Sequence, residues 1–147
     1  MKKALVLATM AATLFSFHGV TNAAVSPEAD LVYYSFGCCQ NQGLEYGATV
    51  YSSSFTSDSS GTIVLNGWQE NDDPTKFVPR VKYSVVTYNY FGDDTVHGSP
   101  ADINGTYRQS GAWYSKTINS IPLNKSGLQI KMQILSYYNV RGAGNAY

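Results

Sequence analysis

The sequence predicts an all-β protein built as a single antiparallel β-sandwich. Three observations indicate this fold class: apolar side chains alternate with period two, the alternating segments are rich in valine, tyrosine and threonine, and glycine or proline stands in nearly every gap. No segment beyond the first 23 residues shows the apolar stripe of an amphipathic helix. About seven strands with short turns fit an immunoglobulin-like or jelly-roll-like sandwich, and a small β-barrel is the main rival.

The expected strands follow this alternation along the chain. In the clearest one, Leu128, Ile130 and Met132 share one face, and mostly polar side chains share the other. Two segments that flank Ser110-Gly111 predict a β-hairpin, because glycine supplies a positive φ in tight turns. The alternating stretch 48–68, with a polar turn at 58–61, predicts a second hairpin. The expected strands are 31–36, 48–55, 62–68, 81–90, 106–109, 113–118 and 128–138.

The two ends of the chain are expected to lie outside the sandwich. Lys2 and Lys3 precede an uncharged apolar run over 4–17, and small residues lead to a cleavage site after Ala23. This run is shorter than the roughly 20 residues that cross a bilayer, so 1–23 is interpreted as a secretory signal peptide rather than an anchor. The protein is therefore expected in the periplasm or outside the cell. Residues 24–138 form the predicted sandwich domain, and 139–147 are predicted to be a flexible tail.

The charges are few and unevenly distributed. Without the leader, ten acidic and eight basic residues remain, a net charge of −2. All seven acidic residues of 24–75 precede the first lysine, whereas 76–147 is mostly basic. Strands from the two halves either neutralise each other by pairing or leave a polarised surface that steers a charged partner. Neither arrangement gives the contiguous basic face that nucleic acid requires.

The sequence lacks the usual constellations of enzymes and of metal or cofactor sites. His97 is the only histidine beyond the leader, and neither a G-x-S-x-G motif nor a zinc-ligand spacing is present. No catalytic activity and no cofactor are therefore expected. Four aspartates in oxygen-rich turns are weak calcium candidates, although aspartate is also simply a good turn former. They are Asp72, Asp73, Asp93 and Asp94.

The adjacent pair Cys38-Cys39 contains the only cysteines of the chain. In an exported protein the two thiols join each other, join another molecule or stay reduced. Neighbouring Cα atoms lie about 3.8 Å apart, below the usual disulfide range of roughly 4.4–6.8 Å, so a bond between them is strained. We expect such a vicinal disulfide, which closes almost no loop and therefore shapes a recognition turn rather than stabilising the fold.

Aromatic side chains are the remaining candidates for ligand contact. If Val81, Tyr83 and Val85 are buried, Tyr88 and Tyr90 point outward, and one of the neighbours Trp113 and Tyr114 is exposed. Exposed tyrosine and tryptophan suit recognition because they offer large contacts with few rotamers to freeze. The predicted ligand-binding residues are Tyr34, Phe36, Cys38, Cys39, Tyr88, Tyr90, Trp113 and Tyr114.

These features predict an exported, non-catalytic protein that binds a glycan or another surface ligand through exposed aromatic side chains. A periplasmic inhibitor or immunity protein that blocks a toxin or hydrolase is the first alternative, favoured by the small size and uneven charge. A secreted membrane-active toxin is the second, because the alternation over 48–68 resembles that of a membrane-inserting hairpin. Few strongly aliphatic residues occur there, so an ordinary hairpin is favoured over membrane contact.

Overall fold

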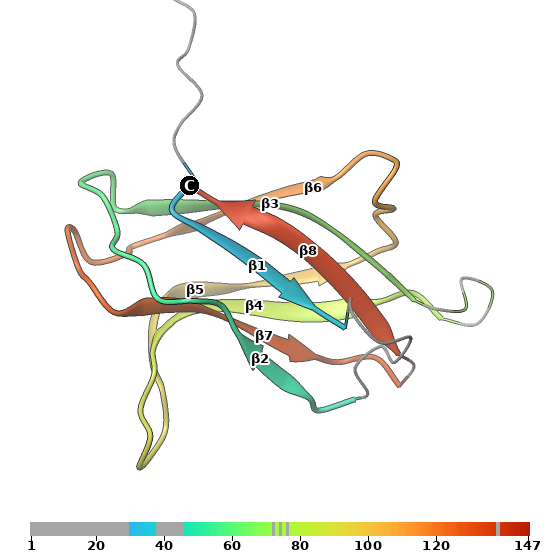
Figure 1. Cartoon of the computed structure of the whole chain (residues 1–147), viewed down its shortest axis with the longest axis horizontal. Coiled ribbons are helices and arrows are strands. Elements are labelled where there is room, and N and C mark those ends of the chain that lie inside the picture. Colours follow the sequence, from blue (N-terminus) through green and yellow to red (C-terminus); the bar gives the residue numbers. More distant parts are fainter. Residues whose placement is uncertain (1–29, 38–45, 72, 74, 76, 138) are drawn as a thin grey trace, which may run out of the picture.

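The structure is a computed structural model that describes residues 30–37, 46–71, 73, 75, 77–137 and 139–147. Two four-stranded antiparallel sheets pack face to face as a sandwich, which confirms the predicted fold class (Figure 1). Sheet 1 has the strand order β1-β8-β3-β6 and sheet 2 has the order β2-β7-β4-β5, so the described strands do not close into a barrel. The strands are β1 Val32–Phe36, β2 Thr49–Tyr51, β3 Thr62–Asn71, β4 Arg80–Thr87, β5 Thr95–Asn104, β6 Tyr114–Asn119, β7 Leu128–Ile134 and β8 Val140–Ala146.

The core lies between the inner faces of the two sheets, where the predicted alternation places the large apolar side chains. Leu128, Ile130, Met132 and Ile134 of β7 are fully buried, and the residues between them are half-buried on the outer face. The strand ends at Ile134 rather than at residue 138. None of the described residues belongs to a helix long and apolar enough to cross a membrane.

The prediction of a flexible tail at 139–147 is wrong, because Val140–Ala146 forms β8, an inner strand of sheet 1 paired with both β1 and β3. Its small residues make room for large rings on the neighbouring strands. A Cβ on Gly144 would lie 2.5 Å from the Tyr34 hydroxyl oxygen, and one on Gly142 would lie 2.6 Å from the Phe36 ring. The glycines that make this segment resemble a tail therefore allow it to pack beneath aromatic side chains.

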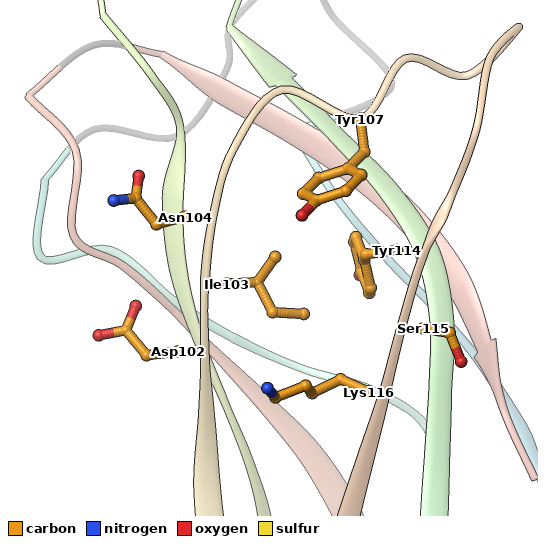
Figure 2. A pocket seen from close by; sticks show the side chains of 7 residues that line it. All are labelled: Asp102, Ile103, Asn104, Tyr107, Tyr114, Ser115 and Lys116. Carbon is orange, nitrogen blue, oxygen red and sulfur yellow. The ribbon is translucent and has the colours of Figure 1, made fainter.

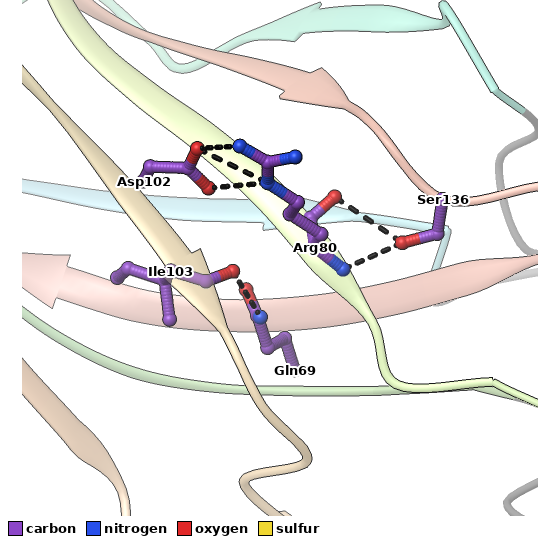
Figure 3. Close-up of polar contacts among 5 residues, drawn as sticks. All are labelled: Gln69, Arg80, Asp102, Ile103 and Ser136. Atoms are coloured by element: carbon purple, nitrogen blue, oxygen red, sulfur yellow. Dashed lines mark hydrogen bonds and ion pairs between the residues drawn. The ribbon is translucent and has the colours of Figure 1, made fainter.

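A buried tyrosine network crosses the centre of the core. The hydroxyl groups of Tyr34 and Tyr114 lie 2.9 Å apart, and the Tyr83 hydroxyl donates to Gln69 Oε1 at 3.0 Å. Gln69 Nε2 donates in turn to the Ile103 carbonyl oxygen at 2.9 Å (Figure 3). Burial raises the pKa of all three tyrosines, so they stay neutral. The network links sheet 1 to sheet 2 and satisfies polar groups that would otherwise be costly to bury.

Both predicted hairpins are wrong in their pairing. Strand β6 pairs with β3, and residues 106–109 contribute only an isolated bridge between Tyr107 and Gln69. Strands β2 and β3 belong to different sheets, so 48–68 does not form the predicted hairpin in this fold.

Strand β5 is a further departure from the prediction, because residues 95–104 contain no expected strand. Its pairing with β4 shifts register between Tyr83 and Val85, opposite an insertion that contains Gly98 and Pro100. Such a bulge bends a strand pair. The β4–β5 hairpin accordingly extends away from the body of the sandwich (Figure 1).

Candidate ligand-binding pocket

A pocket of about 290 Å³ lies at one open side of the sandwich, between β5 and β6 (Figure 2). These are edge strands of sheet 2 and sheet 1, respectively. They approach closely at Gly98, where a Cβ would collide with the Asn119 carbonyl oxygen. The pocket lies further along the two strands and is lined by Asp102, Ile103, Asn104, Tyr107, Tyr114, Ser115 and Lys116.

The floor of the pocket is apolar and is formed by Ile103, Tyr107 and Tyr114. Ile103 and Tyr114 belong to the core, whereas Tyr107 is half-buried. The rings of Tyr107 and Tyr114 meet edge to face, with centroids 5.5 Å apart. The backbone of Tyr107 exchanges two hydrogen bonds of 2.9 Å with Gln69 on β3. The aromatic floor is therefore held by strand-like backbone pairing rather than carried on an unanchored loop.

The rim of the pocket is polar, and its one carboxylate is already paired. Arg80 Nε donates to both Asp102 oxygens, at 3.0 and 3.1 Å, and Arg80 Nη2 donates to Oδ2 at 2.5 Å (Figure 3). The Arg80 amide and carbonyl both bond to the Ser136 hydroxyl, which fixes the start of β4. Hydrogen bonds from Arg80 lower the pKa of Asp102, with the nearby charge of Lys82 acting in the same direction. Asp102 is therefore ionised at neutral pH.

Lys116 occupies an unusual position on the opposite wall. It alternates with Tyr114 and Ile118, two core residues, yet it is exposed. Because β6 is an edge strand, the long stem leaves the core-facing position and carries the amine out to solvent. Figure 2 shows this side chain reaching across the pocket from β6. Within the described part of the chain, the Lys116 amine has no hydrogen-bonding partner and no salt bridge.

Of the predicted ligand-binding residues that the structure describes, only Tyr114 lines the pocket, and it is only 4% exposed. Tyr34 and Phe36 are buried in the core, so the prediction that they contact a ligand at the surface is wrong. The expected contrast between Trp113 and Tyr114 is confirmed, since Trp113 is 43% exposed and donates from Nε1 to the Gln109 carbonyl oxygen. Cys38 and Cys39 lie outside the described residues, and their disulfide stays a prediction.

Tyr88 and Tyr90 are exposed, as expected, but they lie on the β4–β5 hairpin instead of at the pocket. The tip of this hairpin is the pair Tyr90 and Phe91, which are 79% and 94% exposed and meet edge to face. Tyr88 contacts the Tyr51 ring of β2 in the same manner, with centroids 5.1 Å apart. The exposure of Phe91 was not predicted from the sequence.

Asp94 anchors the hairpin to the outer face of sheet 2. Its Oδ2 accepts from the Tyr51 hydroxyl and the Lys131 amine, both at 2.7 Å, and its Oδ1 accepts from the Asn89 amide at 3.2 Å. Burial acts to raise the pKa of Asp94, but these donors outweigh it and the pKa is lowered. Both oxygens of the Asp94 carboxylate therefore already accept hydrogen bonds within the protein, which argues against their use as calcium ligands.

The other calcium candidates gain no support either. Asp73 accepts two hydrogen bonds from Thr75 in a tight turn, Asp93 is exposed, and Asp72 lies outside the described residues. Among the residues that the structure describes, no three acidic, histidine or cysteine side chains gather as a metal site. His97 shares a hydrogen bond of 2.9 Å with Thr87 and does not line the pocket.

Comparison with known proteins adds little to these observations. No family model matches the sequence, and no curated protein matches it. Among solved structures, the chain is similar to a protein described as "Family 16 Carbohydrate Binding Module-2", with a TM-score of 0.37 and 11% sequence identity. The alignment covers 79% of this chain and 82% of that one. A likeness this distant does not identify a ligand.

Proposed function

We propose that the protein is a non-catalytic binding protein that holds one unit of a glycan in the pocket between β5 and β6. The observation that supports this role is the composition of the pocket, an apolar aromatic floor beneath a polar rim. A sugar ring has the matching chemistry, because its C–H faces pack on apolar side chains while its hydroxyl groups need hydrogen-bonding partners. Figure 2 shows the Tyr107 hydroxyl pointing into the pocket, where it can both donate and accept, whereas the Asn104 and Ser115 side chains lie on the outer sides of the two strands.

The size of the pocket also fits a small ligand. About 290 Å³ is at the lower end of the roughly 300–1,000 Å³ that is typical of ligand pockets. The open side of the sandwich leaves room for the rest of a longer chain to extend into solvent. Export through the predicted leader would bring the protein to cell-surface glycans.

Calorimetric titration of the mature protein with a panel of cell-surface oligosaccharides tests this proposal. We expect Tyr107→Phe and Tyr107→Ser each to weaken binding about tenfold, the equivalent of one lost hydrogen bond or ring contact of roughly 1.4 kcal/mol. Tyr88→Ser is the matched control, because it removes an exposed tyrosine that does not line the pocket. Thermal unfolding of each variant separates lost binding from lost folding.

The opposite pattern of binding losses would place the glycan site elsewhere on the protein. If Tyr88→Ser abolished glycan binding while both pocket variants bound normally, the ligand would lie on the outer face of sheet 2. If no oligosaccharide bound the wild-type protein, the glycan proposal itself would fail.

A second candidate function is inhibition of another protein, and the β4–β5 hairpin favours it. Two adjacent aromatic rings stand in solvent at its tip, while the Asp94 contacts with Lys131 and Tyr51 hold its base. A pre-organised aromatic tip suits insertion into the cleft of an enzyme.

This alternative predicts that the wild-type protein slows at least one enzyme in a panel of secreted toxins and cell-wall hydrolases. The double variant Tyr90→Ser/Phe91→Ser should lose the inhibition without a change in unfolding temperature, because both rings are exposed. Equal inhibition by this variant, or no inhibition of any enzyme, would exclude the hairpin as an inhibitory element.

A further inference from the structure

We infer that the pocket selects an acidic sugar, one that carries a carboxylate, and that the Lys116 amine pairs with this group. The inference rests on the proposed function, since it names the chemical class of glycan that the same pocket takes. It is carried by the unequal state of the two charged side chains on the rim: Asp102 is paired and Lys116 is not.

The charges around the rim leave an excess of positive charge. A third cation near the rim, besides Arg80 and Lys116, is Lys82, the cross-strand neighbour of Asp102. Three cations against one carboxylate give a local charge of 3 − 1 = +2, whereas the chain without its leader has a net charge of 8 − 10 = −2. The pocket is therefore a positive site on a protein that is slightly acidic overall, and its field favours an anion.

The fold already satisfies the negative charge of the pocket. Asp102 accepts two parallel hydrogen bonds from Arg80, from Nε to Oδ1 and from Nη2 to Oδ2, which is the bidentate geometry of strong carboxylate pairing. Lys116 has no comparable partner in the described residues. Because β6 is an edge strand, the aliphatic part of this side chain can leave the core-facing position and carry the amine to the opening of the pocket. A carboxylate on the ligand would form a charge-assisted hydrogen bond with this amine at the edge of an apolar floor.

Lys116 could also have a purely structural role that involves no ligand. A charged residue at a core-facing position of an edge strand prevents that strand from pairing with another chain. This protective role requires only a charge, of either sign, and implies no preference among sugars. Lys116→Glu therefore separates the two roles, because it keeps a charge on the edge but reverses the sign that the ligand meets.

The test compares titrations with glucuronic and galacturonic acid and with the neutral sugars glucose and galactose. We expect the wild-type protein to bind a uronic acid about tenfold more tightly than its neutral counterpart, and to lose much of this preference in high salt. Lys116→Gln should remove most of the preference while neutral sugar binding is retained, because the direct partner of the carboxylate is lost, and Lys116→Glu should remove the remainder. Lys125→Gln is the matched control, because this lysine lies between β6 and β7 and does not line the pocket.

The outcomes distinguish this inference from the function on which it rests. Equal binding of neutral and acidic sugars by the wild-type protein would overturn the inference and leave the glycan pocket standing. A preference for uronic acids that is undiminished in Lys116→Gln would also overturn it, because another group would then be responsible. Absence of binding to any sugar, with folded wild-type protein, would reject both.

Discussion

Replacing Gly144 by alanine is expected to destabilise the protein by roughly 3 kcal/mol, the upper end of the cost of overpacking a core. The added Cβ would lie 2.5 Å from the Tyr34 hydroxyl oxygen and 2.7 Å from the Gly67 Cα, and it would collide with the Asn66 carbonyl oxygen. Two of these obstacles are backbone atoms of β3, which cannot move without disturbing the sheet. The loss would be measured as a lower midpoint in urea unfolding.

Gly111→Ala is the matched control for this substitution. A Cβ at Gly111 would meet only Arg108 atoms at 3.6 Å, which is an ordinary contact, and this glycine does not have a positive φ. We expect a change within about 0.5 kcal/mol, as for most surface substitutions. If the two variants were equally stable, Val140–Ala146 would not be an inner strand beneath Tyr34.

Replacing Ile130 by aspartate is expected to cost about 3 kcal/mol or more and to leave little folded protein at 37 °C. Ile130 is fully buried at the centre of β7, and an aspartate there would either hold an unpaired charge or take up a proton at a similar cost. Circular dichroism should show loss of the strand signal at a lower temperature, together with binding of a dye to exposed apolar surface.

Gln133→Asp is the appropriate control on the same strand. Its side chain lies on the outer face, opposite Lys82 in the register, so a new carboxylate should change stability by less than about 0.5 kcal/mol. The neighbouring Lys131 is a poor control, because its amine pairs with Asp94 and a carboxylate there would repel that side chain. Similar losses from Ile130→Asp and Gln133→Asp would contradict the assignment of the two faces of β7.

The sequence predicts well those strands whose own side chains fill the core. Strand β7 alternates large apolar residues with polar ones, and β4 places Val81, Tyr83 and Val85 on its inner face. Strand β8 has no such pattern because its core volume is supplied by its neighbours: Tyr34 and Phe36 occupy the space above its glycines. No local pattern reveals a strand whose packing partners lie a hundred residues away along the chain.

Strand β5 escapes prediction for a different reason. Gly98 and Pro100 resemble turn residues, whereas in the structure they belong to the irregular region where β5 departs from the register of β4. The hairpin between 106–109 and 113–118 fails because each segment pairs with β3 instead of with the other. Turn signals in this chain therefore mark where the backbone bends, but not which strands become neighbours.

Most of the candidate pocket could not be predicted from the sequence, for a related reason. Its lining comes from β5, β6 and the connection between them, and the two strands belong to different sheets. Periodicity indicated that one of Trp113 and Tyr114 faces inward, but not which of the two, nor what the inward residue lies against. One signal was present in the sequence: Lys116 occupies a place in the alternation between Tyr114 and Ile118 where an inner strand of a sheet would carry an apolar residue.

The position of β8 has a consequence for how the protein folds. Strand β1 and strand β3 do not pair with each other; each pairs with β8, and the register joins Val32 to Ala146. Strand β1 therefore has no partner in sheet 1 until β8, more than a hundred residues later in the chain, is in place. Pairing between β3 and β6 can form earlier, but sheet 1 is completed only through this long-range contact, so we expect the protein to fold slowly.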